Sequence, residues 1–284
     1  MLLTMTLATP AVVKSLSPGG LLEAPRVVRE QFGLHGLHVS TSLLKGADRT
    51  ALGKFRDAAD RAGCACLVLL EPPLHLAASR RRQHEPAMAR ALKLIEAASL
   101  LGCNSLVLGL TGEDDEATFG RAVDQLQELA EIAEKRELNI LISPTKGLTA
   151  DPDRVIAIIK KVGGFRVGTC PDFQAAAERE DPAGYLRRLT PYASAVSAST
   201  LEFVNLVEEA GLGGEGGNED EGLDALADLL SAPEHLPWDL EAMVEAVRSV
   251  GYDGTLAVDY RGTAGTLGIR QSCEALEAAL MPLE

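Results

Sequence analysis

Two acidic residues, Asp172 and Asp259, each follow an apolar run of the kind that forms a buried strand. A carboxylate at the end of such a strand is partly desolvated, and desolvation raises its pKa toward values that suit acid–base catalysis. The alternative is structural, because a carboxylate at the start of a loop also accepts backbone N–H bonds. Both interpretations stay open, and we treat the two aspartates as candidate catalytic residues.

Several other polar side chains stand at equivalent positions, at or just after the end of an apolar run. His38 is one of them, and His35 lies three residues before it, a spacing that places the two rings on opposite faces of a strand. These two histidines therefore cannot form a joint metal site. The remaining candidates are Lys146 as a catalytic residue and Ser143, Gln174, Ser197, Thr200, Arg261, Glu71 and His38 as substrate-binding residues.

Short apolar runs alternate with longer amphipathic segments along the whole chain. Most of the runs are nearly continuous in apolar residues, which is typical of parallel strands that are buried on both faces. The predicted strands are Leu3–Ala8, Gly36–Ser40, Cys66–Leu70, Ser105–Leu110, Asn139–Ser143, Arg166–Cys170, Ala193–Ser197 and Thr255–Asp259.

The segments between these strands carry helical signals. Apolar residues recur with a helical period over Phe119–Ala133, and Met88–Leu101 is a second segment of this kind. Asp151-Pro152 and Asp181-Pro182 each place an N-cap side chain before a proline, which favours a helix start.

This strict alternation of strands and helices favours a (β/α)8 TIM barrel over an open doubly wound sheet. The open sheet stays as an alternative, because alternation alone does not establish closure. No Gly-x-Gly-x-x-Gly string follows any predicted strand, which argues against a dinucleotide-binding fold. We expect residues 1–284 to form one barrel, since barrels of this length are commonly single domains.

One segment interrupts the alternation. Residues 201–237, after the seventh strand, are rich in glycine and acidic residues, a composition typical of a flexible and self-repelling loop. The segment follows the C-terminal end of a strand, where barrels hold their active sites. A lid over the site and a tolerated surface insertion are both consistent with it.

The charge and hydropathy of the chain exclude several classes of protein. The formal net charge of −14 disfavours binding to nucleic acid, because phosphate backbones are also negative. No run of eighteen or more apolar residues is present, so we expect no membrane span. The N-terminus lacks the basic residues of a secretion signal, and we expect a cytoplasmic protein.

Several strings resemble the sugar phosphate isomerases and epimerases that share the xylose-isomerase-like barrel. The Gly-Tyr-Asp-Gly string at residues 251–254 carries this resemblance most specifically. The resemblance covers nearly the whole chain and is clear after about residue 85. The other matching strings are Leu101–Val107, Ala122–Arg136, Leu138–Ser143, Val167–Asp172, Pro191–Thr200, Trp238-Asp239 and Leu256–Tyr260.

The resemblance implies a metal site, which this sequence matches unevenly. Those enzymes bind one divalent metal through a Glu, an Asp, a His and a second Glu on strands five to eight. The strand-six Asp is retained as Asp172, and the strand-eight Glu becomes Asp259. The strand-five Glu falls on Ser143, and the strand-seven His falls on Ser197.

Two carboxylates and two hydroxyls form a poor metal site. Catalytic divalent sites normally use three protein ligands plus water, and a neutral serine does not balance the charge of a dication. We therefore expect no cofactor, with a weakly bound divalent ion at Asp172 and Asp259 as the alternative. The proton-shuttling pair of Glu residues is also broken, so the family mechanism is not carried over to this chain.

Two hypotheses for the function follow. In the first, the protein is a sugar or sugar-acid isomerase or epimerase (EC class 5) that acts without a tightly held metal, with Asp172 or Asp259 as base and Lys146 as an electrostatic clamp on the enediolate. In the second, it is a non-catalytic carbohydrate-binding or partner subunit, so a protein partner or a homodimer is expected. An abasic-site endonuclease would need a richer metal cluster and a basic face, which the sequence lacks.

Overall fold

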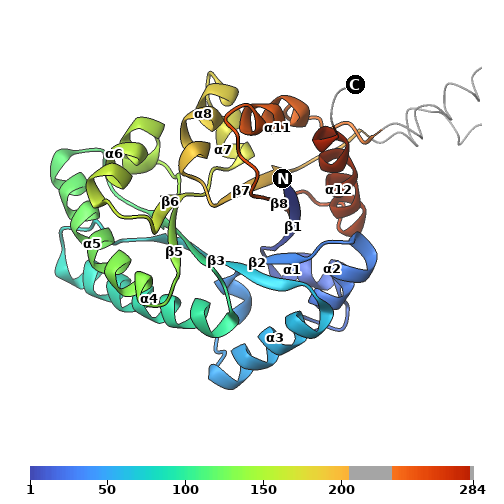
Figure 1. Cartoon of the computed structure of the whole chain (residues 1–284), viewed down its shortest axis with the longest axis horizontal. Helices are drawn as coiled ribbons and strands as arrows, with labels where there is room; N and C mark the ends of the chain where they lie inside the picture. The colour runs from blue at the N-terminus through green and yellow to red at the C-terminus, as the bar shows by residue number, and fades with distance from the viewer. Residues whose placement is uncertain (205–231, 282–284) are drawn as a thin grey trace, which may run out of the picture.

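The computed structural model describes residues 1–204 and 232–281 as an eight-stranded, all-parallel sheet surrounded by helices (Figure 1). The strand order is β6-β5-β4-β3-β2-β1-β8-β7, and two parallel bridges, Thr169 with Ala193 and Asp172 with Ser197, join β6 to β7. The sheet therefore closes into a barrel. Its strands are β1 Leu2–Leu7, β2 Gly36–Ser40, β3 Ala65–Leu74, β4 Ser105–Leu110, β5 Asn139–Ser143, β6 Val167–Thr169, β7 Ala195–Thr200 and β8 Thr255–Tyr260.

Helices form the outer ring around these strands (Figure 1). They are α1 Pro10–Leu16, α2 Ala24–Phe32, α3 Arg49–Ala62, α4 Arg81–Leu101, α5 Glu116–Glu134, α6 Pro152–Val162, α7 Phe173–Ala177, α8 Pro182–Leu189, α11 Leu240–Arg248 and α12 Thr266–Leu280. Short 3-10 turns lie at Thr41–Leu44 (η1), Gly147–Thr149 (η2) and Thr190–Tyr192 (η3). The predicted (β/α)8 TIM barrel is confirmed.

Helix starts follow the capping signals of the sequence. Asp151 accepts a hydrogen bond from the Asp153 N–H at the start of α6, and Asp181 accepts one from the Gly184 N–H at the start of α8. Each satisfies a backbone donor that the helix itself leaves unpaired. Both helices therefore start at the prolines of the two Asp-Pro pairs.

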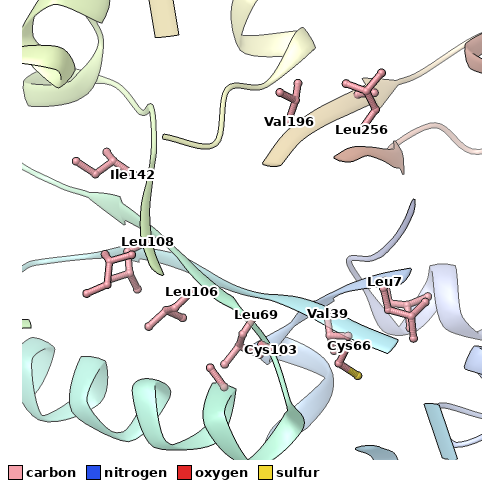
Figure 2. Close-up of a cluster of buried hydrophobic side chains, with 14 of the residues drawn as sticks. Leu7, Val39, Cys66, Leu69, Cys103, Leu106, Leu108, Ile142, Val196 and Leu256 are labelled. Atoms are coloured by element: carbon pink, nitrogen blue, oxygen red, sulfur yellow. The ribbon is translucent and has the colours of Figure 1, made fainter. Parts of the chain in front are cut away.

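The core has two layers because strand side chains alternate between the two faces of the barrel wall. Those that point outward pack against the helices, and Figure 2 shows Leu69 and Leu106 on one side of the barrel with Val196 and Leu256 on the other. The smaller inner layer includes Val68, Val107, Leu141, Cys170 and Ala195. Polar residues at the strand ends consequently face the barrel axis when they are an even number of residues away from these inner-layer residues.

His38 belongs to this inner layer rather than to the mouth of the barrel. Its side chain is buried, and its Nε2 lies 3.3 Å from the Thr4 hydroxyl on β1. Burial lowers the pKa of His38 from 6.5 to about 3, so the ring is neutral near pH 7. The prediction that His38 contacts a substrate gains no support from this position.

Several element boundaries differ from the predictions, and the hydrogen bonds explain two of the differences. α4 starts at Arg81 rather than Met88, because the N–H groups of Gln83 and His84 bond to the Arg80 carbonyl and the helix continues past Pro86. β7 ends at Thr200 rather than Ser197, because the ladder with β8 continues to the pair of Thr200 with Tyr260. Both changes extend an element beyond its apolar run.

Most of the predicted 201–237 insertion, residues 205–231, lies outside the described residues. The predicted lid or surface insertion therefore stays a prediction. Within the described residues, no helix is both long enough and apolar enough to cross a membrane.

The buried His38 should make stability depend on pH. In the folded protein the ring stays neutral above about pH 3, whereas in the unfolded chain it takes up a proton below about pH 6.5. The unfolded state therefore binds more protons between these values, and stability falls as the pH falls from 6.5 toward 3. At pH 4.5 this single group should remove roughly 2–3 kcal/mol of unfolding free energy.

Urea unfolding of wild type and His38→Gln at pH 7 and pH 4.5 measures this contribution. The variant should lose less stability than wild type between the two pH values. His35→Gln is the matched control, because His35 is exposed. This variant should lose as much unfolding free energy between pH 7 and pH 4.5 as wild type does. If wild type and His38→Gln lose the same unfolding free energy between the two pH values, the histidine is not buried as a neutral ring.

Candidate functional site

A cluster of polar side chains lies at the C-terminal ends of β6, β7 and β8, where the barrel closes. Asp172 lies between β6 and α7 as the N-cap of that helix, and Asp259 lies on β8. All these strands are parallel, so their C-terminal ends meet at one face of the barrel. The cluster consists of Asp172, Gln174, Ser197, Ser199, Asp259 and Arg261.

The register of β7 and β8 sets the geometry of the cluster. Ser199 pairs with Asp259, and both share the inward parity of Ser197. The neighbouring Thr200 has the opposite parity, and its hydroxyl lies 2.7 Å from the Ser272 hydroxyl on α12. Thr200 therefore points away from the cluster, although it follows Ser199 directly.

The Arg261 guanidinium lies between the two carboxylates. Its Nη2 bonds to Asp259 Oδ2 at 2.6 Å and also to Asp172 Oδ2. Its Nη1 lies 3.2 Å from Asp172 Oδ1, and its Nε lies 3.0 Å from Asp259 Oδ2. The contact with Asp172 is thus the two-pronged fork in which an arginine matches a carboxylate best.

Every N–H group of this guanidinium has an acceptor within the cluster. Besides the bonds to the two aspartates, Nη1 donates to Gln174 Oε1 at 2.7 Å. A guanidinium carries five N–H donors, one on Nε and two on each Nη. A ligand would reach Arg261 only by displacing one of these partners, of which Gln174 is the neutral one.

Asp172 has both carboxylate oxygens engaged. Its Oδ1 accepts from the Ala175 N–H at 2.9 Å and from the Ser199 hydroxyl at 3.3 Å, in addition to Arg261. Its Oδ2 accepts from Arg261. Asp172 is therefore both a helix cap and a fixed partner of the guanidinium, as the structural interpretation of its position expects.

Asp259 has a different environment. Its Oδ2 accepts from Arg261 and from the Ser197 hydroxyl at 3.2 Å, whereas its Oδ1 is buried without a hydrogen-bond partner in the described part of the chain. Burial raises the pKa of Asp259, the charge of Asp172 adds to this, and Arg261 opposes it. A proton taken up by Asp259 would therefore go to Oδ1, the oxygen that no donor occupies.

Arg261 stays protonated and carries its positive charge. Burial opposes its protonation, but the two aspartates outweigh burial and raise its pKa above the ordinary arginine value. With two carboxylates and one guanidinium, the cluster has a formal charge of −1 when both acids are ionised.

The structure does not bring every predicted residue to this cluster. Glu71 on β3 pairs with Arg90 of α4 through two bonds of 2.9 Å and accepts a bond from the Thr41 hydroxyl. Ser143 ends β5 half-buried, and Lys146 is exposed just before η2. Ser143 and Lys146 lie at the same face of the barrel, since each follows the C-terminal end of β5.

A cavity of about 430 Å³ adjoins the cluster at this face. A volume of this size is in the range of small-molecule sites. Its lining comes from the loop after β1, from α1, from the end of β8 with the loop that follows it, and from α12. Arg261 is the cluster residue that lines it, whereas Asp172 and Asp259 do not. The other lining residues include Thr9, Val12, Tyr260, Thr263 and Ile269.

The donor set does not fit a tightly held divalent metal. Among residues 1–204 and 232–281, no group of three or more His, Cys, Asp or Glu side chains is arranged to hold an ion. Of the four positions that the resemblance assigns to ligands, Asp172 and Asp259 carry the carboxylates, and Arg261 binds both. Three of their four oxygens are therefore already paired with a cation.

Ser199 is not among the site residues predicted from the sequence. Its hydroxyl donates to Asp172 and accepts from the Gln174 N–H at 2.8 Å. Its two-residue spacing from Ser197 was the available signal, because residues i and i+2 of a strand share one face. The pairing of Arg261 with both acids had no signal in the sequence, since it depends on how β6 and β8 meet.

The chain is similar in fold to several solved sugar-converting enzymes. It resembles the 3-keto-D-glucoside 4-epimerase YcjR from E. coli with a TM-score of 0.68 and 13% identity, over 98% of this chain and 99% of that one. It resembles an L-ribulose 3-epimerase with a TM-score of 0.69 and 13% identity, over 98% and 96%. An IolI protein with a bound zinc atom matches with a TM-score of 0.67 and 16% identity, over 98% and 96%.

These identities are low, and they establish a shared fold alone. No curated protein matches the chain by sequence. The model of one family, the xylose isomerase-like TIM barrel, matches residues 31–279, which span all strands from β2 to β8. The chain therefore belongs to the xylose isomerase-like TIM barrel family.

Proposed function

We propose that the protein binds a carbohydrate or a sugar acid at the C-terminal face of the barrel and acts on it as an isomerase or epimerase without a tightly held metal. The observation that carries this proposal is the cluster of Asp172, Asp259 and Arg261 at the barrel mouth, of which Arg261 lines the 430 Å³ cavity. The family and the sugar epimerases of the same fold support the substrate class.

The cluster suits polyhydroxyl ligands. Sugars present hydroxyl groups that donate to carboxylates and accept from amides, and the half-buried Gln174 offers an amide N–H₂ group beside Arg261. Because the cluster carries a formal charge of −1, a neutral sugar should bind closer to it than a sugar acid does. An acidic group would instead be placed toward the exposed Lys146, whose ammonium carries the opposite charge.

Asp259 is the better of the two candidate bases. Among the described residues its Oδ1 has no partner, whereas both oxygens of Asp172 are engaged. A raised pKa makes Asp259 a stronger proton acceptor than an ordinary aspartate. Asp259 would take the proton from the carbon next to the sugar carbonyl, and the electron pair of the broken C–H bond would form the enediolate.

The reaction is completed by returning a proton to carbon. Asp259 Oδ1 delivers a proton to the neighbouring carbon, and the hydroxyl proton of the enediolate passes to the former carbonyl oxygen. These two transfers give the isomer and restore the carboxylate, so atoms and charge balance without a further reactant. Lys146 is proposed to stabilise the negative enediolate oxygen as an electrostatic clamp. Ser143, Ser197 and Arg261 complete the proposed substrate-binding residues near the mouth.

Ligand binding at the cluster is tested by thermal unfolding with a panel of neutral sugars, sugar acids and sugar phosphates. A ligand that binds only the folded state raises the midpoint, and neutral sugars should do so most. Gln174→Leu should abolish the shift, because it removes the amide that a hydroxyl would contact. Gln83→Leu, an equivalent change at an exposed position on α4, should retain it.

An identical shift in Gln174→Leu and Gln83→Leu would place the ligand elsewhere. No shift with any member of the panel would contradict carbohydrate binding.

Catalysis is tested by incubating the bound sugar in D₂O and following deuterium at the carbon next to the carbonyl by NMR. Wild type should incorporate deuterium, because a proton on Asp259 exchanges with solvent. Asp259→Asn should still bind but lose at least about 100-fold in exchange rate, as expected for removal of a general base. Asp253→Asn, a matched change at an exposed loop residue before β8, should exchange at the wild-type rate.

Binding without exchange in wild type would contradict the isomerase proposal and favour the non-catalytic carbohydrate-binding subunit. If deuterium exchange survives in Asp259→Asn and disappears in Asp172→Asn, the general base is Asp172 rather than Asp259.

A further inference from the structure

We propose that Arg261 is the resident cation of this barrel and that its guanidinium takes the place of the divalent metal at the strand ends. The proposal rests on the contacts of Arg261 with Asp172 and Asp259, and it does not depend on which ligand the protein binds. It names the group that balances the charges of Asp172 and Asp259.

The two carboxylates require a cation close by. Asp172 is 8% exposed and Asp259 is 6% exposed, so water stabilises neither charge well. Buried carboxylates are normally paired or bound to a metal, because the cost of desolvation is large. Arg261 meets this need from two residues beyond Asp259, on the same strand end.

The guanidinium also holds the carboxylates in fixed positions. It forms a two-pronged contact with Asp172 on one side and contacts Asp259 Oδ2 through Nε and Nη2 on the other. An arginine stays protonated at all pH values at which proteins fold, so this cation is not lost as the pH changes. Arg261 is therefore a positioning residue for Asp259, because it fixes Oδ2 and leaves Oδ1 without a partner among the described residues.

The same contacts exclude a dication for two separate reasons. The guanidinium occupies three of the four carboxylate oxygens that a metal would use. Its positive charge also repels a second cation at close range, where the local dielectric is low. Removing the guanidinium should leave two unbalanced carboxylates beside two serine hydroxyls, which is enough to hold a hydrated Mn²⁺ weakly.

Titration with Mn²⁺, followed by the electron paramagnetic resonance signal of the free ion, tests this inference without any sugar or turnover. Wild type should bind no Mn²⁺ tightly. Arg261→Ala should bind one Mn²⁺ at least about 100-fold more tightly than wild type, since a cation a few ångströms from the ion is removed. Arg261→Ala combined with Asp172→Asn should return to the wild-type affinity, because one carboxylate is lost.

Arg270→Ala is the matched control, because Arg270 lies on α12 over the ring of Phe32 and away from the cluster. It should bind Mn²⁺ no better than wild type. Arg261→Met, which keeps most of the apolar stem, replaces Arg261→Ala if the smaller residue prevents folding. The wild-type titration needs no variant at all.

Two outcomes would overturn the inference. One is tight, stoichiometric binding of Mn²⁺ by wild type, and the other is an Arg261 variant that folds but binds no more tightly than wild type. Neither bears on sugar binding, so a failure here is distinguishable from a failure of the proposed isomerase function.

Discussion

The ion pairs of Arg261 with Asp172 and Asp259 are the constraint on which the site depends. They join the ends of β6 and β8 across β7, at the point where the sheet closes through the Asp172–Ser197 bridge. One guanidinium therefore balances two desolvated carboxylates and connects the C-terminal ends of β6 and β8. The chemistry available at the barrel mouth follows from how this one cation distributes its bonds.

That distribution separates the roles of the two acids. Asp172 gives its oxygens to a helix cap, a serine and the guanidinium, and so becomes part of the scaffold. Asp259 keeps one buried oxygen that no donor of residues 1–204 and 232–281 reaches, which is costly in a protein interior and is typical of functional positions. The asymmetry gives a reason for Asp259, rather than Asp172, to exchange a proton with a ligand.

Much of the fold could be predicted from the sequence, because buried parallel strands have an unmistakable apolar pattern. Asn139–Ser143 and Ser105–Leu110 were placed at their observed bounds. The site was harder to predict, since every strand-end residue looks alike in the sequence. Glu71 is paired with Arg90 on the outer helix α4. Thr200 faces α12 because its side chain lies on the outer face of β7. The pairing of Arg261 with both acids arises only when the barrel closes.

A barrel whose strand-end cation is Arg261 needs no metal ion between Asp172 and Asp259. Elemental analysis of the protein purified without chelators measures this most directly, because it reports the metal content of the native state. We expect far less than one zinc, manganese or iron ion per chain. One equivalent of such a metal, lost when Asp172 and Asp259 are both replaced by asparagine, would contradict this expectation.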